Sequence, residues 1–217
     1  MKIHTESFIR ELLGPGVERR DLEFKAPFTW EKQGPQWLKE RTIRAVLALH
    51  NTPSGGVILI GVIGHDDRPP DVPGVSAREL KSFSNEEAVL AEICGYSTEQ
   101  ITLTIGTGVY RESEVTKSDV VVFEVVGLDE LPTICTKAGK EKGTLAPSAI
   151  YSRPKLGVPA SAPVTPHELE EIVRHGVERR VRWINSLGPL TLDDAGQGRE
   201  AAARQDFSNE IGELWQD

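Results

Sequence analysis

The chain has 217 residues and a formal net charge of −8, from 33 acidic and 25 basic side chains. Its length fits one domain, or one domain with an extension, and 38% hydrophobic with 27% charged residues is a globular composition. The acidic balance excludes a protein whose whole surface coats DNA, because phosphate binding needs clustered cations, but a local basic groove remains compatible with it.

The first part of the chain predicts alternating helices and strands. Turn residues and an alternating Leu-Glu-Phe-Lys pattern at residues 22–25 separate two helical repeats of apolar residues. The run Asn-Thr-Pro-Ser-Gly-Gly at residues 51–56 precedes a buried type of strand. The expected elements are a helix at 5–13, a strand at 17–25, a helix at 36–50 and a strand at 57–62.

The later part predicts one helix, several strands and a long terminal helix. Thr165 is a candidate cap for the terminal helix, and Pro166 suits its first position. A proline-rich stretch at 159–163 is predicted to be a linker. The expected elements are a helix at 77–92, strands at 101–107 and 120–126, short strands at 132–137 and 149–152, and a helix at 166–187.

This order of elements predicts an α+β fold, a mixed β-sheet with helices packed on it. We expect one domain over residues 1–187. Residues 188–217 differ in composition and are expected to form a C-terminal tail, with a weak helix at 199–215.

Cysteine and histidine positions argue against a zinc or disulfide framework. Cys94 and Cys135 have no Cys-x-x-Cys spacing, and the five histidines are scattered. The N-terminus has no apolar signal core, and the longest apolar run, at residues 57–63, is too short to span a bilayer. We therefore expect a cytoplasmic protein with no zinc and no membrane association.

Glu18, Glu23 and Lys25 are the first candidates for chemistry. Glu23 and Lys25 share a strand face, where a carboxylate can bind a divalent cation and a lysine can stabilise charge on a phosphate. In a regular strand Glu18 would lie on the opposite face, and only a turn or bulge at residues 16–20 would bring it to Glu23. The alternative is an exposed ladder of salt bridges.

Two polar loops flank the apolar strand at 57–62. Residues 51–56 either present amides and Asn51 to phosphate or serve as a helix-to-strand connector that needs glycine. His65, Asp66 and Asp67 follow the strand and either complete a metal site with the glutamates or form a polar loop. No P-loop motif occurs, which disfavours an ATPase of that type.

A set of cations surrounds Tyr151 in the sequence. Basic side chains with an interleaved aromatic residue suit a single strand or loop of RNA, because cations track phosphates and the ring stacks a base. The alternative is a solvated loop. The candidate nucleic-acid-binding residues are Lys140, Lys142, Arg153 and Lys155, with Lys137 nearby.

These segments together resemble the Schlafen-type AlbA-like domain. The resemblance rests on Leu-Glu-Phe-Lys at 22–25, on Asn-Thr-Pro-Ser-Gly-Gly-Val-Ile-Leu-Ile-Gly-Val at 51–62, and on Ile-Tyr-Ser-Arg at 150–153. It covers roughly residues 5–180. Nuclease members of this family cut structured RNA such as tRNA with three carboxylates and a divalent metal.

The resemblance implies which residues would hold the metal. Glu18 and Glu23 match two of the three carboxylates, and Mg²⁺ or Mn²⁺ is the implied ion. The third acid directly follows the Gly-Val strand end in the family, whereas this chain has Ile63 and Gly64 there. Asp66 is favoured over Asp67 as the third ligand after a short insertion. Animal members carry two such lobes in one chain, so the single lobe implies a homodimer.

Two functions follow as hypotheses. The first is a metal-dependent endoribonuclease that acts on structured RNA, with Glu18, Glu23 and Asp66 as metal ligands and Lys25 beside the phosphate. The rival is a non-catalytic module that binds DNA or RNA, of the transcriptional-regulator type. Nucleotide binding is a third and least favoured possibility, because the chain has no P-loop.

Overall fold

The computed structural model describes residues 1–14, 16–65, 68–128, 132–153 and 160–186. The chain divides into two compact units, Met1–Arg179 and Arg180–Asp217. Of the second unit, only residues 180–186 are described. The domain boundary expected from the sequence lies between residues 187 and 188, and the predicted tail helix at 199–215 is outside the described residues.

Five strands form one mixed sheet, which confirms the predicted α+β class. Their order is β1-β4-β5-β3-β2, with β1 parallel to β4, β2 parallel to β3, and β5 antiparallel to both of its neighbours. A separate two-stranded sheet pairs β6 with β7. The strands are β1 (Lys2–Ile3), β2 (Leu22–Lys25), β3 (Gly56–Ile60), β4 (Leu103–Arg111), β5 (Lys117–Val125), β6 (Tyr151–Ser152) and β7 (Ala162–Pro163).

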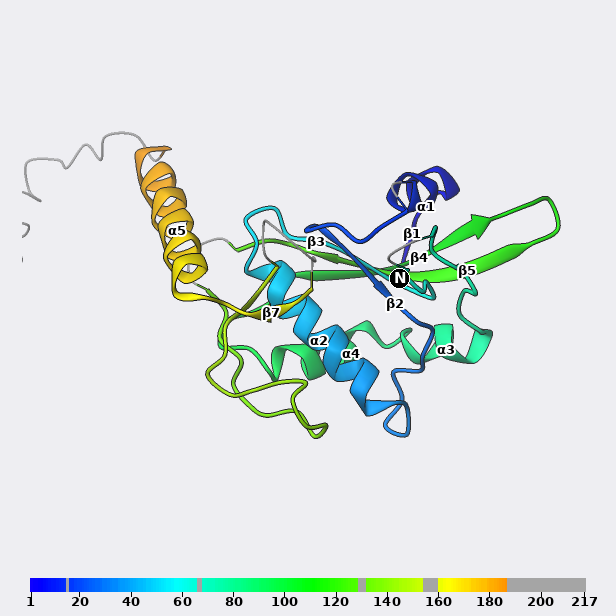
Figure 1. Ribbon diagram of the computed structural model, residues 1–217, viewed down its shortest axis with the longest axis horizontal. Helices are drawn as coiled ribbons and strands as arrows, with labels where there is room; N and C mark the ends of the chain where they lie inside the picture. The colour runs from blue at the N-terminus through cyan, green and yellow to red at the C-terminus, as the bar shows by residue number, and fades with distance from the viewer. Residues whose placement is uncertain (15, 66–67, 129–131, 154–159, 187–217) are drawn as a thin grey trace, which may run out of the picture. The chain divides into compact units, whose positions relative to one another are not determined.

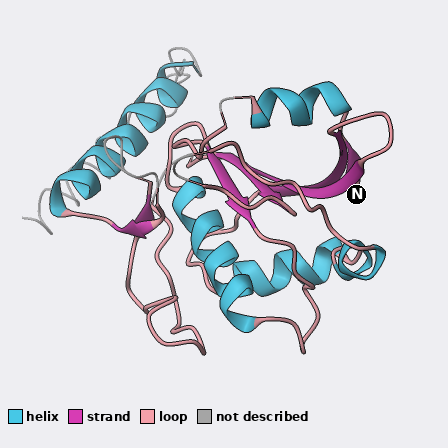
Figure 2. Cartoon of the chain, turned by 45° about the vertical axis from the view of Figure 1, so that its right-hand side comes forward, coloured by secondary structure: helices cyan, strands magenta, loops and turns pink. Residues whose placement is uncertain are grey.

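Helices cover both faces of the five-stranded sheet (Figures 1 and 2). One face packs on α1, and the other packs on α2, α3 and α4. Strand β5 serves both cores because its side chains alternate: Val120 and Val122 face α1, whereas Val121 and Phe123 face α2. The helices are α1 (Glu6–Leu13), α2 (Gln36–His50), α3 (Ala77–Ser82), α4 (Glu86–Cys94) and α5 (Pro166–Ser186).

Helix caps explain where several elements begin. The amide of Phe8 donates to Thr5 Oγ1 at 3.3 Å, and α1 starts at the next residue after Thr5. Thr165 and Glu168 form a reciprocal capping pair at the start of α5, as the sequence predicts for Thr165. None of the described helices combines the length and apolar character that crossing a membrane requires.

The single helix predicted over residues 77–92 is wrong, because the structure has two. Ser76 and Glu79 form a capping box at the start of α3. Asn85 Oδ1 then accepts from the amide of Ala88 at 3.2 Å and starts α4. An asparagine side chain that bonds the backbone in this way favours a new helix start over continuation of the first helix.

Strands β4 and β5 differ in their bounds from the predicted strands at 101–107 and 120–126. The remaining differences concern short pairings. Strand β1 was not expected, and it is only two residues long. Residues 132–137 contain no named strand, since Cys135 makes only an isolated bridge with Ser97. Strand β7 lies within the predicted linker and pairs with β6. These segments are too short to carry a periodic pattern, so their partners decide their structure.

Candidate functional site

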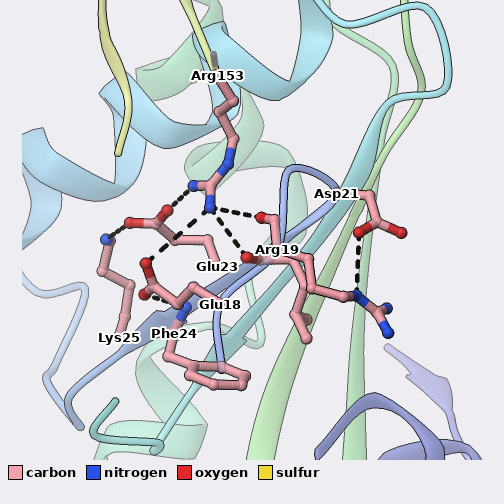
Figure 3. Close-up of polar contacts among 8 residues, drawn as sticks. Glu18, Arg19, Asp21, Glu23, Phe24, Lys25 and Arg153 are labelled. Carbon is pink, nitrogen blue, oxygen red and sulfur yellow. Dashed lines mark hydrogen bonds and ion pairs between the residues drawn. The ribbon is translucent and has the colours of Figure 1, made fainter. Parts of the chain in front are cut away.

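A turn before β2 brings Glu18 beside Glu23. The strand predicted over residues 17–25 is too long, because β2 begins at Leu22, and Arg19 and Leu22 exchange two backbone hydrogen bonds of 3.1 Å. The chain reverses there, so Glu18 and Glu23 approach the same arginine instead of lying on opposite faces (Figure 3). The two carboxylates therefore converge because of a turn before β2, the condition that the sequence sets for their approach.

That arginine is Arg153, which follows β6. Its side chain is fully buried and forms an ion pair with Glu23, while Nη2 lies 4.0 Å from Glu18 Oε2. Nη2 also donates to the carbonyls of Arg19 at 2.7 Å and Leu22 at 3.0 Å (Figure 3). Burial lowers the pKa of Arg153 to about 10, although Glu18 acts in the opposite direction. The arginine stays charged at neutral pH.

The position of Arg153 corrects its predicted role. A residue that grips a nucleic-acid backbone must reach solvent, and this guanidinium is enclosed by the two carboxylates and by backbone carbonyls. Burial of an unpaired charge is costly, so the chain neutralises it with Glu18 and Glu23, which lie far earlier in the sequence. Arg153 therefore orders the carboxylates and does not present a charge at the surface.

Glu18 and Arg153 also close the outer edge of β2. The carbonyls of Asp21 and Lys25 accept hydrogen bonds from the β3 side, so Leu22 and Phe24 turn their backbone groups outward. There the amide of Phe24 donates to Glu18 Oε1 at 2.9 Å, and the carbonyl of Leu22 accepts from Arg153. The ion-paired side chains thus replace a neighbouring strand.

Lys25 lies on the same face of β2 as Glu23, as the sequence predicts. Its ammonium forms an ion pair with Glu23 Oε1, and only 12% of its side chain is exposed. Burial lowers the pKa of Lys25 to about 8; Glu18 raises it, and the charges of Arg44 and Arg41 lower it further. Lys25 is therefore mostly charged at pH 7 and begins to lose its proton in mildly alkaline solution.

These side chains line a pocket of about 560 Å³. Glu18, Glu23 and Lys25 form one wall together with the loop that follows β3, while the N-terminal half of α2 forms another. Ala160 and Ser161, just before β7, complete the lining. The pocket volume is in the range found for small-molecule and cofactor sites.

Sequence reasoning missed the contribution of α2 to this pocket. Trp37, Arg41 and Arg44 lie at helical spacing on one face and all line it. The guanidinium of Arg41 is 5.3 Å from the centre of the Trp37 ring, which is 46% exposed. The available signal was two arginines and a tryptophan on one stripe of a helix that also carries an apolar stripe.

The loop after β3 runs along the pocket. His65 lines it, and His65 Nε2 lies 2.9 Å from Asp71 Oδ2, which Arg68 also contacts. A Cβ built on Gly64 would lie 3.9 Å from Glu18 Oε1, so this loop passes close to the first carboxylate. Asp66 and Asp67 lie outside the described residues, and their role as a third ligand stays a prediction.

Glu18 and Glu23 bind cationic side chains in this arrangement. Lys25 forms an ion pair with one carboxylate oxygen of Glu23, and Arg153 forms an ion pair with the other. Arg153 Nη2 also lies 4.0 Å from Glu18 Oε2. A divalent cation does not fit between the carboxylates while Arg153 occupies that position, because like charges repel at such distances. Among residues 1–14, 16–65, 68–128, 132–153 and 160–186, no group of three or more His, Cys, Asp or Glu side chains is arranged to hold a metal ion.

The predicted basic loop is anchored on α2. The buried carboxylate of Glu40 accepts from the amides of Lys140 at 2.6 Å and Glu141 at 3.1 Å, and from the Thr144 hydroxyl. Lys140 and Lys142 are exposed, as a phosphate-binding role requires. Arg44 Nη1 lies 3.5 Å from the carbonyl of Thr144, so the end of this loop contacts an arginine of the pocket lining. Lys155 is outside the described residues.

Of the two roles considered for residues 51–56, the structure shows the helix-to-strand connector. Asn51 is buried, donates to the carbonyls of Thr133 and Tyr151, and accepts from the Thr133 amide. Gly55 has φ +67°, and a side chain there would collide with the backbone of Val125. Asn51 and Gly55 therefore serve backbone packing and do not face a ligand.

Comparison with known proteins does not assign a family. No family model matches the chain, and no curated protein matches it. One similar solved structure is the crystal structure of the DIP2311 protein from Corynebacterium diphtheriae, at 16% sequence identity and a TM-score of 0.40. The match covers 71% of this chain and 24% of that protein, so the chain spans about a quarter of its length.

Proposed function

We propose that the pocket between β2 and α2 binds the phosphodiester backbone of nucleic acid, and of RNA in preference to DNA. The observation that carries this proposal is the presence of Lys25, Arg41 and Arg44 in one pocket of a chain whose net charge is −8. Clustered cations in an acidic protein indicate a place where an anion binds. The preference for RNA comes from the family that the sequence resembles.

The charge balance of the described site supports anion binding. Four cations, Lys25, Arg41, Arg44 and Arg153, stand against the two carboxylates of Glu18 and Glu23, which leaves two positive charges. Arg153 and the carboxylates are tied to one another, whereas α2 contributes arginines without an acid on its pocket-lining stripe. Lys140 and Lys142 are exposed on the loop that ends at Thr144, whose carbonyl accepts from Arg44.

Fluorescence anisotropy with a labelled RNA hairpin tests this function. We expect binding that weakens with salt, because each neutralised phosphate releases counterions. Arg44→Gln should weaken binding and flatten the salt dependence. Arg78→Gln is the matched control, since Arg78 is exposed on α3 and pairs with Glu31 away from the pocket. Two results would refute the proposal. One is an equal effect of the two substitutions on RNA binding, and the other is no RNA binding by the wild type at about 50 mM salt, where electrostatic binding is strong.

Metal-dependent cleavage of structured RNA such as tRNA is the second candidate. The convergence of Glu18 and Glu23 beside Lys25 favours it. Glu18, Glu23 and Asp66 would hold Mg²⁺ or Mn²⁺, which requires Arg153 to leave its present position. The ion would supply an activated water and charge neutralisation, and Lys25 would contact the phosphate.

Incubation of tRNA with the protein and Mn²⁺ separates the two candidates. Cleavage by the wild type, absent in Glu23→Gln and in EDTA, would establish the second. If tRNA stays intact at protein concentrations that saturate binding, the first candidate, binding without cleavage, is the one that remains.

We also propose that the protein acts as a homodimer in the cytoplasm. Two copies would offer two pockets to one RNA molecule, as the two lobes of animal members of the resembled family do, and a two-fold dimer is the common arrangement. Light scattering on the protein alone and with RNA tests this. A mass of one chain under both conditions would contradict it.

A further inference from the structure

We infer that the pocket holds a single unstacked nucleotide, with its base against Trp37 and its phosphate among Lys25, Arg44 and Ser161. The inference rests on the proposed function and narrows it: the protein would bind RNA at unpaired positions, such as loops, bulges or ends. Three features of the pocket lead to this assignment.

The first feature is a pair of buried polar atoms, in two residues of the pocket lining, that have no hydrogen-bond partners among the described residues. Ser161 is 7% exposed, and its hydroxyl has no partner among the described residues; the same holds for Nε of Arg44. Both residues line the pocket. A buried polar atom without a partner costs about 1–3 kcal/mol. A ligand oxygen that accepts from both groups would remove that cost.

The second feature is the charge around these atoms. Lys25 and Arg44 both line the pocket, and the charge of Arg44 lowers the pKa of Lys25. Arginine and lysine beside a hydroxyl are the donors that a phosphate group takes in proteins. The cations and the hydroxyl of the pocket lining therefore suit a phosphate, whose oxygens can accept from such side chains.

The third feature is the exposed ring of Trp37 in the same pocket lining. Trp37 precedes Arg44 by seven residues on α2, which corresponds to about 10 Å along the helix axis. A nucleotide spans such a separation between its phosphate and its base. Trp37 carries Arg41 beside its ring and leaves almost half of its surface to solvent. Aromatic rings of this kind bind unpaired bases by stacking.

The pocket size sets the limit of one unpaired nucleotide. In an A-form duplex the bases stack on one another, and only their edges and the backbone reach a protein. A base can meet Trp37 only after it has left the stack. A space of about 560 Å³ admits a nucleotide but not a helix, so a continuous duplex would contact only the rim.

Binding of three labelled RNAs to the full chain tests the inference: a single strand, a blunt duplex, and the same duplex with one bulged nucleotide. We expect the wild type to bind the bulged duplex about tenfold more tightly than the blunt one, on the order of one stacked base. Trp37→Leu should weaken binding to the single strand and the bulged duplex by about 5- to 150-fold. It should leave the blunt duplex unchanged, and Trp37→Phe should retain most of the affinity.

Different results would refute this inference and the proposed function. Equal binding of bulged and blunt duplexes, with no effect of Trp37→Leu, would overturn the nucleotide pocket while Arg44→Gln still weakens all three RNAs. If Arg44→Gln and Lys25→Gln leave every affinity unchanged, the phosphate-binding function is itself refuted.

Discussion

Glu18 accepts a hydrogen bond of 2.9 Å from the backbone amide of Phe24, so the first carboxylate of the site also completes the edge of strand β2. Arg153 does the same for the carbonyl of Leu22 while it faces both glutamates. The residues that the sequence suggests for chemistry therefore carry part of the fold. Substitutions at this site must be assayed for stability and for binding separately.

Replacement of Glu18 separates its backbone role from its charge. Glu18→Ala leaves the buried Phe24 amide without an acceptor, and we expect a loss of about 1–3 kcal/mol in the free energy of unfolding. Glu18→Gln keeps an acceptor and should lose less. Urea unfolding measures both, with Glu6→Ala as the control, because Glu6 is a more exposed acid in a helical i,i+4 pair. Equal losses for Ala and Gln would mean that the amide contact contributes nothing.

Removal of Arg153 leaves two carboxylates without their shared partner. We expect Arg153→Met to lower the free energy of unfolding by about 3–5 kcal/mol, the range for breaking a buried ion pair. The double variant Arg153→Met with Glu23→Gln should recover part of this loss, because one stranded charge is removed as well. A loss below about 1 kcal/mol, typical of exposed pairs, would contradict the enclosed position of Arg153.

The proton of Lys25 predicts a pH dependence of RNA binding. Its folded-state pKa of about 8 lies below the ordinary value of 10.5, and a bound phosphate favours the charged form. The affinity for RNA should therefore be highest at about pH 7 and below, and decrease as pH rises through about 8 toward 10. Lys25→Arg, which does not titrate there, should show a flat profile over the same range. Anisotropy at constant ionic strength measures both proteins, and identical profiles would exclude a role for the Lys25 proton.

Glu40 predicts the behaviour of the basic loop. Glu40→Ala removes the acceptor of the Lys140 and Glu141 amides, so we expect these two amides to exchange hydrogen much faster while the α1 amides keep their protection. Gly139→Ala should have a similar effect without changing any charge, because its Cβ would collide with the Glu40 carboxylate and the Thr144 hydroxyl. Unchanged exchange in both variants would show that the loop holds its conformation without Glu40.

Elements with a clear period were predicted well from the sequence. Helix α2 has the predicted bounds, Gln36–His50, because its apolar residues repeat over four turns and a turn cluster ends it. The Thr5 and Thr165 caps were also visible in the local sequence. The same local chemistry at Asn85 was available and would have divided the helix at 77–92.

The errors at Arg153 and at the pocket face of α2 depend on partners distant in the sequence. The residues next to Arg153 in the sequence predict an exposed cation. In the structure Arg153 is buried and pairs with Glu18 and Glu23, which lie near the other end of the chain. Trp37, Arg41 and Arg44 look like the solvent face of a helix until the wall formed by β2 makes that face one side of a pocket. Local patterns do not encode such pairings, because tertiary packing decides them.

The distance in sequence between β2 and Arg153 has a consequence for synthesis of the protein. Leu22 and Arg153 are 131 residues apart, so at bacterial and eukaryotic elongation rates the arginine is added on the order of ten seconds after the strand that it covers. During that interval only Glu18 and the turn at Arg19 cover the outer edge of β2, and Glu18 and Glu23 lack the counter-charge of Arg153. Sheet edges that are incompletely covered recruit other chains. Newborn chains should therefore be most prone to aggregation, and most dependent on chaperones, until translation has passed residue 153.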